Sequence, residues 1–470
     1  MPAIMVAGTS SHVGKSVITA AICRILAKRG YSVAPFKAQN MSLNSYVTED
    51  GKEIAVAQAF QARACGIEPN EFMNPILLKP KGHGVSQLVL LGESVGDFTV
   101  REYYSTIPKL KKVVEEAYRW LEEEYDVIVI EGAGGIAEIN LYDRDLANIH
   151  TARIAKPATI IVGDIDRGGV FASLYGTFSL LPDDVRSLVS GFVINKFRGD
   201  PSLLEPGLRE LERLTGVEVL GVVPYVTLNF TPEDSVSLED WKGEGRIAVV
   251  RLPRISNFTD FVPLKGFGVE FVWKKRLEEY EVVIVPGSKD TVADLKELKD
   301  SGMAEEIRRF GNPVIGICGG YQMLGRELVD EGVEHGRVRV KGLGLLDAVT
   351  VFRDYRKVTR RVRRRVNGNA VILERIRGET VEGYEIHKGR TVARNPIFED
   401  EGCASEDGRV WGTYMHGLFE NANVLRALGD FLGVKVKIER DWVEEFTRVV
   451  EERVRLDPIL ERILSQPARL

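Results

Sequence analysis

Two stretches of the sequence place reactive or charged side chains between glycines. Residues 8–16 read GTSSHVGKS, and residues 316–320 read GICGG. The first stretch joins a glycine loop to Lys15 and Ser16, which suits the binding of anionic phosphates. The second presents the thiol of Cys318 at a sharp turn, which suits nucleophilic attack. The sequence therefore indicates two separate chemistries in one chain.

The candidate phosphate loop lies between an expected strand at residues 4–7 and an expected helix at residues 16–29. Backbone N–H groups and the helix N-terminus would face the phosphates, the lysine would reach the terminal ones, and the serine could ligate magnesium. The glycines stand one residue further apart than in the usual loop, a form that resembles the loop of dethiobiotin synthetase and its relatives, which phosphorylate a carboxylate or carbamate. We interpret His12 as a solvated loop residue. The predicted ATP-binding residues are Gly8, Thr9, Gly14, Lys15 and Ser16.

Carboxylates near this loop are candidates for holding the Mg²⁺ that accompanies ATP. An expected strand at residues 127–130 ends in Glu131, at the edge where open α/β sheets bind ligands. Glu53 aligns with a metal-binding aspartate of the dethiobiotin synthetase pattern, and a surface helix carboxylate is the alternative. The predicted metal ligands are Ser16, Glu53 and Glu131.

Further polar side chains follow other expected strands of the first half. Lys37 ends one such strand and precedes Gln39 and Asn40. A cation there could neutralise a transferred phosphoryl group or an acidic substrate, so we predict that these three residues contact the substrate. Asp164 and Asp166 follow another strand, and for them metal binding and a structural role both stay open.

The cysteine stretch has the form of a nucleophile elbow. Cys318 lies between an apolar strand, expected at residues 314–317, and a helix. The Gly319 N–H and a second backbone donor at Gly287 could stabilise a developing oxyanion. A thiol nucleophile usually needs a base, and His416 is our candidate. This pairing matches the triad-type (class I) glutamine amidotransferase domain.

The group that orients His416 is unassigned. Many domains of this type carry glutamate two residues after the histidine, where this chain has Leu418, and Glu420 is a weak candidate. We interpret His387 as a structural histidine. The basic run at residues 353–365 is most simply a solvated strand or hairpin, and a patch facing a polyacidic substrate or a partner domain is the alternative.

Composition narrows the class of protein. The 470 residues are 44% hydrophobic and 28% charged, with a formal net charge of −5, which excludes a largely disordered chain and a strongly basic nucleic-acid binder. The four cysteines form no CxxC pair, and no apolar run has the length of a membrane span. We expect a cytoplasmic protein that binds neither nucleic acid nor membrane, with an oligomer possible.

Short apolar runs alternate with amphipathic stretches, which predicts an α/β fold with two parallel-sheet domains. A stretch rich in acidic residues, glycine and proline at residues 231–245 is typical of a linker. We expect an ATP-dependent amidoligase domain at residues 1–235, a glutamine amidotransferase domain at residues 246–435 and a helical tail at residues 436–470. Within the tail, the spacing predicts a helix at residues 441–456 that is interrupted at Pro458.

Longer blocks resemble the cobyric acid synthase family over about residues 4–432. They are residues 37–41, 73–80, 138–141, 163–172, 194–200 and 251–260. The resemblance implies ATP-, Mg²⁺- and glutamine-dependent amidation of four carboxylates (b, d, e and g) of adenosylcobyrinic acid a,c-diamide, through acyl phosphates, in cobalamin biosynthesis. It also implies that Cys318 and His416 carry the glutaminase and that residues 8–16 bind ATP.

Two alternatives stay open. One is cobyrinic acid a,c-diamide synthase, which modifies two other carboxylates; the blocks at residues 37–40 and 73–75 argue against it. The other is a P-loop regulatory or assembly ATPase with a vestigial amidotransferase module, which would not hydrolyse glutamine.

Overall fold

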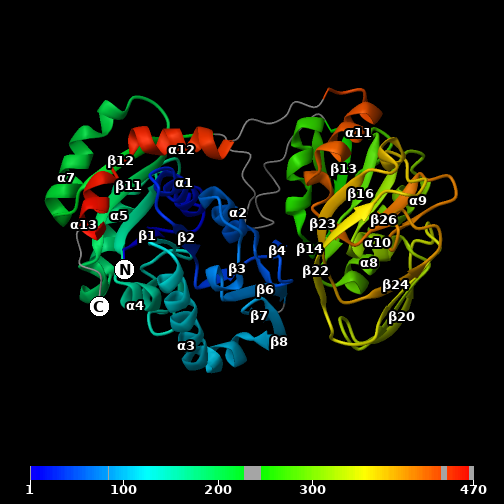
Figure 1. Ribbon diagram of the computed structural model, residues 1–470, viewed down its shortest axis with the longest axis horizontal. Coiled ribbons are helices and arrows are strands. Elements are labelled where there is room, and N and C mark those ends of the chain that lie inside the picture. Colours follow the sequence, from blue (N-terminus) through cyan, green and yellow to red (C-terminus); the bar gives the residue numbers. More distant parts are fainter. Residues whose placement is uncertain (1, 83, 227–244, 436–441, 465–470) are drawn as a thin grey trace.

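The computed structural model describes residues 2–82, 84–226, 245–435 and 442–464. They form two α/β units that lie side by side, one built mainly from residues up to 226 and the other from residue 245 onward (Figure 1). Each unit is organised around a six-stranded sheet. The predicted α/β fold class is confirmed. The expected linker at residues 231–245 lies almost wholly outside the described residues.

The sheet of the first unit is entirely parallel, in the order β12-β11-β10-β1-β9-β2. Its strands are β1 (Ala3–Gly8), β2 (Val33–Phe36), β9 (Val127–Glu131), β10 (Ala158–Asp164), β11 (Val189–Phe197) and β12 (Val219–Pro224). Buried side chains of β1 alternate between two hydrophobic cores, with Ile4 and Val6 facing one core and Met5 and Ala7 the other. Helices therefore cover both faces of this sheet, as the near-continuous apolar strands require.

The helices of the first unit include α1 (Lys15–Lys28), α2 (Val56–Cys65), α3 (Val100–Glu124), α4 (Thr151–Ala155), α5 (Val170–Leu180), α6 (Asp183–Arg186) and α7 (Glu205–Thr215). Helix α3 begins well before its expected start at residue 109. Thr99 and Glu102 form a reciprocal capping box that starts it at Val100, and Pro108 lies inside the helix.

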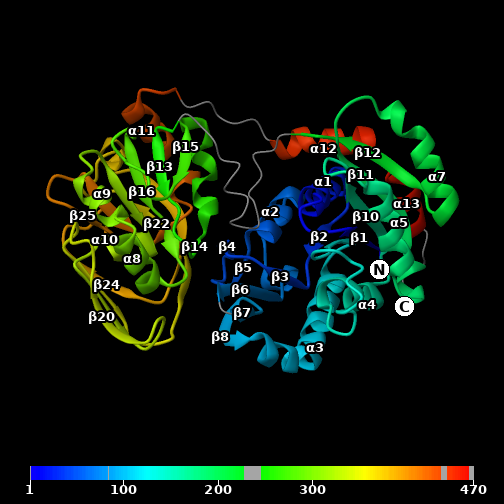
Figure 2. The ribbon, with the colours of Figure 1, turned by 180° about the vertical axis from the view of Figure 1, so that it is seen from behind.

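A mostly β insertion lies between β2 and α3. It contains β3 (Gln39–Met41), β4 (Ser45–Val47), β5 (Glu53–Ala55), β6 (Ile76–Gly82), β7 (Val85–Leu90) and β8 (Glu93–Thr99). Strands β3, β6, β7 and β8 form a four-stranded sheet, and β4 pairs with β5 as a hairpin. In Figures 1 and 2 this insertion faces the second unit.

The main sheet of the second unit has the order β15-β13-β16-β18-β26-β25, and only β25 runs antiparallel to its neighbour. Its strands are β13 (Ile247–Val250), β15 (Val269–Val272), β16 (Val282–Val285), β18 (Val314–Ile317), β25 (Cys403–Ala404) and β26 (Val410–Thr413). Its helices include α8 (Thr291–Asp300), α9 (Met303–Arg309), α10 (Gly319–Leu324) and α11 (Ala422–Leu432).

Smaller sheets flank this main sheet. One contains β19 (Glu327–Glu331), β20 (Arg337–Lys341), β21 (Ala348–Phe352) and β24 (Arg390–Ala393). A second contains β22 (Val358–Arg365), β23 (Thr380–His387) and β27 (Met415–His416), and a third pairs β14 (Ile255–Ser256) with β17 (Gly287–Ser288). The 3-10 helix η5 (Phe258–Phe267) follows β14.

The C-terminal helices return to the first unit. Helix α12 (Trp442–Arg453) packs against α1 and β12, and α13 (Asp457–Leu464) contacts β10 (Figures 1 and 2). Phe446 and Val450 belong to one of the two cores of the first unit. Pro458 lies in the first turn of α13, where proline is tolerated. The predicted cap at Asp441 lies outside the described residues.

The two units meet where the β4–β5 hairpin lies against β22 and β23. Tyr46 and Ile54 of the hairpin form a hydrophobic cluster with Tyr384 and Ile386 of β23. The Ser45 N–H donates to Asn257 Oδ1 at 3.3 Å across the same boundary. In the part of the chain that the structure describes, no helix has the length and apolarity needed to span a bilayer.

Candidate active sites

The phosphate loop is shaped by close backbone contacts at the carboxyl end of β1. The Thr9 N–H donates to the Val162 carbonyl at 3.0 Å, and Asn195 Nδ2 donates to the Val13 carbonyl at 2.8 Å. Gly14 has φ 103°, and a Cβ there would lie 2.2 Å from Asn195 Nδ2. A side chain at this position would therefore displace the loop, which explains why glycine stands there.

Lys15 and Ser16 open helix α1 directly after this loop. Lys15 Nζ donates to the carbonyls of Ser10 at 2.9 Å and Gly134 at 2.8 Å, so its ammonium spans the mouth of the loop. Ser16 Oγ donates to Glu131 Oε1 at 2.8 Å. The loop, its lysine and a strand-end carboxylate thus meet at one edge of the sheet, because β9 lies next to β1.

Glu131 is the centre of a fully buried polar cluster. Lys37 Nζ donates to its Oε1 at 2.8 Å, while Gln58 and Gln61 donate to its Oε2 at 3.2 and 2.5 Å. Lys37 follows β2, the strand beside β9, so the parallel sheet itself brings the lysine and the glutamate together. The side chain of Glu131 is 0% exposed, and such a buried carboxylate requires these donors.

The donor set at this cluster fits Mg²⁺. Ser16 Oγ and the Glu131 carboxylate are oxygen atoms of the kind that Mg²⁺ prefers, beside the phosphate loop, and Glu131 would exchange part of its contacts with Lys37, Gln58 and Gln61 for the ion. Among the described residues no group of three or more His, Cys, Asp or Glu could hold a metal ion. Mg²⁺ bound with a nucleotide takes few protein ligands and completes its shell with phosphate oxygens and water, so two protein oxygens suffice.

Glu53 is not placed with these oxygens. Its carboxylate forms ion pairs with the ammonium groups of Lys79 and Lys357, in a fully buried position at the boundary between the units. Burial opposes ionisation, but Lys357 and Lys79 together hold the pKa of Glu53 well below its ordinary value. Both oxygens of Glu53 thus pair with ammonium groups, which favours a structural role, and the metal role of Glu53 stays a prediction.

Asp164 and Asp166 also have structural partners. Lys196 Nζ donates to Asp164 Oδ2 at 2.8 Å and to the His12 carbonyl at 2.7 Å, which ties the strand end to the phosphate loop. Asp166 accepts from Arg198 Nε at 2.8 Å. For these two carboxylates the structure favours a positioning role over metal binding.

The three predicted substrate residues occupy different environments. Lys37 contacts Glu131, as described above. Asn40 Nδ2 donates to Gln58 Oε1 at 2.9 Å, and Gln58 in turn donates to Glu131, so Asn40 helps to position the buried cluster. Gln39 accepts a hydrogen bond from the Tyr103 hydroxyl and lines an open cavity beside the phosphate loop. Neither Lys37 nor Asn40 lines this cavity, so Gln39 is the best placed of the three to contact a substrate in it.

Cys318 stands at a strained turn between β18 and α10. Its φ is 52°, and its N–H donates to the Thr413 carbonyl of β26 at 2.8 Å. A Cβ on Gly320 would lie 1.8 Å from the Val285 carbonyl, so no larger residue fits beneath the turn. A non-glycine residue held at positive φ stores strain that is typical of nucleophile elbows.

His416 is held by Asp260. The distance from His416 Nδ1 to Asp260 Oδ2 is 2.7 Å, and the Gly417 N–H donates to Asp260 Oδ1 at 3.0 Å. Cys318 and His416 both line one small cavity. Burial opposes a charged imidazole, but the Asp260 carboxylate and the Cys318 sulfur outweigh it and raise the pKa of His416 to about 10. The arrangement is a Cys-His-Asp triad in which the Asp260 carboxylate favours the charged imidazole of His416.

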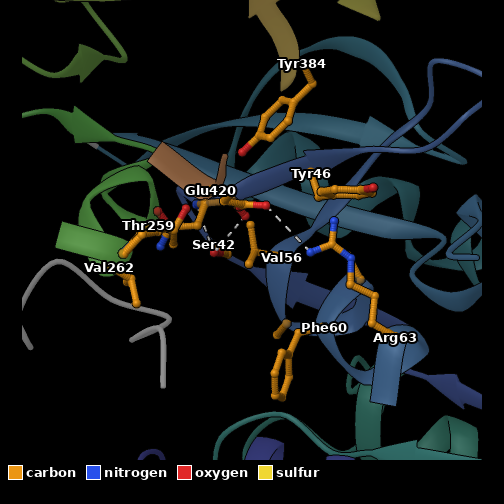
Figure 3. A pocket seen from close by; sticks show the side chains of 13 residues that line it. Ser42, Tyr46, Val56, Phe60, Arg63, Thr259, Val262, Tyr384 and Glu420 are labelled. Carbon is orange, nitrogen blue, oxygen red and sulfur yellow. Dashed lines mark hydrogen bonds and ion pairs between the residues drawn. The ribbon is translucent and has the colours of Figure 1, made fainter. Parts of the chain in front are cut away.

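Asp260 replaces our weak candidate for this role, Glu420. In Figure 3 the Glu420 carboxylate points to the guanidinium of Arg63, from which it lies 3.8 Å, across the boundary between the units. Burial raises the pKa of Glu420, and the neighbouring Arg63 opposes this shift. The reason for the error is topological: Asp260 comes from η5, far from His416 in the sequence, and only the fold joins them.

The predicted oxyanion residues, Gly287 and Gly319, are chain neighbours of Ser288 and Cys318, which line the same cavity. A Cβ on Gly287 would lie 3.6 Å from His416 Cε1, and a Cβ on Gly319 would lie 2.8 Å from the Ser288 nitrogen. The ends of β16 and β18 are thus in close contact, as adjacent parallel strands require. The cavity also takes Lys79, Lys81 and Gln87 from the first unit. Both units therefore enclose the thiol.

His387 has a structural environment. Its ring stacks on Tyr414 with 3.7 Å between the ring centroids, and its Nδ1 lies 2.7 Å from the Gly389 carbonyl. Burial lowers the pKa of His387 to about 4, so it stays neutral beside the triad. This agrees with our sequence-based interpretation.

Two residues of the basic run at residues 353–365 contact the first unit. Lys357 pairs with Glu53, and Arg361 lies 3.6 Å from Glu49 and 3.7 Å from Glu68. Arg353 and Arg363 are largely exposed and pair with Glu331 and Glu382 of the second unit, so the run is partly a solvated face and partly a contact with the other unit.

Comparison with known proteins assigns a class to each unit. Residues 4–236 match the family described as CobQ/CobB/MinD/ParA nucleotide binding domain, and residues 246–424 match the CobB/CobQ-like glutamine amidotransferase domain. Among solved structures, a glutamine amidotransferase matches with a TM-score of 0.29 and 21% identity, over 40% of this chain and 100% of that chain. A TM-score this low supports no further inference. The chain is a glutamine-hydrolysing ligase with a nucleotide-binding domain.

Relatives along nearly the whole chain define the family more closely. The chain is 66% identical to the probable cobyric acid synthase of Archaeoglobus fulgidus, over 97% of this chain and 99% of that protein. It is 52% identical to the probable cobyric acid synthase of Methanococcoides burtonii, over 99% and 98%. The chain belongs to the cobyric acid synthase family, as the sequence blocks predicted.

Proposed function

We propose that this protein converts the b, d, e and g carboxylates of adenosylcobyrinic acid a,c-diamide to amides, with ATP and glutamine as co-substrates. The observation that carries the proposal is the Cys318–His416–Asp260 triad, in a cavity that residues of the ATP-binding unit help to enclose. Membership of the cobyric acid synthase family supports the substrate class.

The first unit would activate the carboxylate. A substrate carboxylate oxygen attacks the γ-phosphorus of ATP, the bond to the β,γ-bridging oxygen breaks, and ADP leaves an acyl phosphate behind. Lys15 at the loop and Lys37 at Glu131 lie where cations would offset the charge on the phosphoryl oxygens. Ser16 and Glu131 would hold Mg²⁺, which neutralises phosphate charge when bound.

The second unit would release ammonia from glutamine. The Cys318 thiolate attacks the side-chain amide, the oxyanion is stabilised at Gly319 and Gly287, and the His416 imidazolium protonates the departing ammonia. Water, deprotonated by His416, then hydrolyses the thioester to glutamate. The raised pKa of His416 supports this role as a proton donor near neutral pH.

Transfer would join the two reactions. Ammonia attacks the acyl-phosphate carbon, phosphate leaves, and a proton is released as the amide forms. Free ammonia is largely protonated at neutral pH and then ceases to be a nucleophile. The contact between the β4–β5 hairpin and β22–β23 supports direct passage between the units, because it brings the thiol cavity against the ATP-binding unit.

The test is mass spectrometry of the corrinoid after incubation with ATP, Mg²⁺ and glutamine. We expect four successive replacements of OH by NH2. An unchanged mass, with adenosylcobyrinic acid a,c-diamide as substrate, would contradict the proposal. Conversion of cobyrinic acid itself, with addition of only two amides, would favour cobyrinic acid a,c-diamide synthase. Absence of glutamine hydrolysis in both wild type and Cys318→Ser would favour a vestigial module.

A further inference from the structure

A cavity of about 350 Å³ opens beside the phosphate loop. It lies between the β3–β6–β7–β8 sheet, the start of α3 and the segment that follows β9. Its size falls in the range of small-molecule sites, which are mostly apolar with a few convergent polar groups. The apolar and aromatic side chains in its wall include Met41, Leu78, Phe98, Val100, Tyr103 and Tyr104.

Three of these side chains are unusually accessible. Met41 is 54% exposed, Val100 53% and Tyr104 37%. Exposure of large apolar side chains to water is unfavourable, and a bound ligand would cover them. Clusters of such side chains at the mouth of a cavity therefore mark binding sites. Met41 is also flexible, which suits a ligand that binds in more than one orientation.

The cavity is continuous with the ATP site. Gly134 belongs to its wall, and the same residue accepts a hydrogen bond from Lys15 Nζ at 2.8 Å. Gly135 also lines it, and a Cβ on Gly135 would lie 3.0 Å from the Thr9 carbonyl. A molecule in the cavity would therefore present one edge to the terminal phosphate of a nucleotide held by the loop.

The cavity wall contains several polar side chains, among them the carboxylate of Asp145, whose oxygens accept from the backbone N–H and the carboxamide of Asn148. The carboxamide of Gln39 is fixed by the Tyr103 hydroxyl. The Arg144 guanidinium lies 4.6 Å from the centroid of the Tyr104 ring, which positions a cation at the mouth of the cavity. The cavity thus combines apolar side chains with a cation, Arg144, and the carboxylate in its wall, Asp145, is already hydrogen-bonded to Asn148, which suits an amphipathic ligand with carboxylates at its rim.

We propose that this cavity binds the face of the corrin macrocycle, and this inference rests on the proposed function. Four different carboxylates at the rim of one ring must each reach the same phosphate. A site that held the macrocycle by directional hydrogen bonds would fix it in one orientation. Apolar contact is non-directional, so it permits all four orientations. Met41, Val100 and Tyr104 provide the apolar contact, and Arg144 contacts a carboxylate that points away from the phosphate.

Two substitutions test the site without disturbing a core. Val100→Asp puts a carboxylate into the wall, where it repels a polyanion, and its place in the first turn of α3 favours the helix. Tyr104→Ala removes an exposed aromatic face. Leu203→Asp is the matched control, because Leu203 is 78% exposed on the same unit and does not line the cavity.

The measurements are KM for adenosylcobyrinic acid a,c-diamide, KM for ATP, and binding of the diamide without ATP by equilibrium dialysis. We expect both cavity variants to raise KM and the dissociation constant for the diamide about tenfold. KM for ATP and basal glutamine hydrolysis should stay within about twofold, and Leu203→Asp should resemble wild type.

Separate results would overturn the inference and the proposed function. If wild type amidates the diamide and the cavity variants bind it as Leu203→Asp does, the cavity is not the corrinoid site, although the function stands. If the variants instead raise KM for ATP alone, the cavity takes part of the nucleotide. If wild type makes no amide, the proposed function itself fails.

Discussion

Asp260 Oδ2 lies 2.7 Å from His416 Nδ1, and this contact completes the triad of Cys318. The same carboxylate accepts the Gly417 N–H at 3.0 Å, so the position of Asp260 is fixed relative to the backbone of the histidine. The orientation of the imidazole therefore depends on a residue of the 3-10 helix η5, at the opposite end of the second unit's sequence.

Asp260→Asn should lower kcat for glutamine hydrolysis at least about 100-fold, because the amide favours the wrong imidazole tautomer. Amidation supported by added ammonium chloride should be unchanged, since it bypasses the thiol. Glu420→Gln is the matched control and should hydrolyse glutamine within about twofold of wild type. Equal losses in the two variants would show that Asp260 does not orient the base.

The raised pKa of His416 predicts a pH dependence. Its folded value of about 10 lies above the ordinary value of about 6.5, so the stabilisation from the charged imidazole is complete below about pH 6.5 and is lost as pH rises through about 10. Urea denaturation should therefore show that the free energy of unfolding falls between about pH 7 and 10, and Asp260→Asn should remove most of this dependence. A variant that loses as much stability as wild type over this range would contradict the assigned charge on His416.

Glu131→Gln should abolish most ATP-dependent amidation, by at least about 100-fold, while leaving glutamine hydrolysis in place. The reason is that Glu131 joins Ser16, Lys37 and two glutamines in one buried cluster. Phosphate release measures the effect. Asp166→Asn, whose carboxylate pairs with Arg198, is the control and should retain activity within about threefold. A Glu131→Gln enzyme as active as this control would exclude the assigned role.

Glu53→Gln should destabilise the contact between the two units. It leaves the ammonium groups of Lys79 and Lys357 buried without their counter-charge, at a cost of about 3–5 kcal/mol. Urea denaturation measures the loss. Glu93→Gln removes an exposed partner of Lys52 and should leave the stability close to that of wild type. Similar costs for both variants would mean that the buried cluster contributes little.

Features that depend on local sequence were predictable. The strand, glycine loop and Lys15-Ser16 occupy neighbouring positions, and so do the strand and turn that carry Cys318. The predicted strand at residues 127–130 agrees with β9 and correctly places Glu131 at the sheet edge. The sequence indicated only that Lys37 and Glu131 each stand at the end of a strand. The order of the parallel strands, with β2 beside β9, then brings the two side chains together.

Features set by tertiary packing could not be predicted. Asp260 lies inside a block that the family resemblance had marked, yet no spacing connects it to His416. The ion pair of Glu53 with Lys357 was not foreseen, because an alignment position does not reveal a partner in the other unit. The predicted tail packs on α1 through Phe446 and Val450, because its apolar face is complementary to a core formed by residues at the other end of the chain.

The central claim is that ammonia released at Cys318 becomes the amide nitrogen of an ATP-activated carboxylate. The most direct measurement is mass spectrometry of the corrinoid after incubation with ATP and glutamine labelled with ¹⁵N in its side-chain amide. Wild type should transfer four labelled nitrogens, and Cys318→Ser none from glutamine but four from labelled ammonium. Label transfer from glutamine by Cys318→Ser, or no transfer by wild type, would contradict the account.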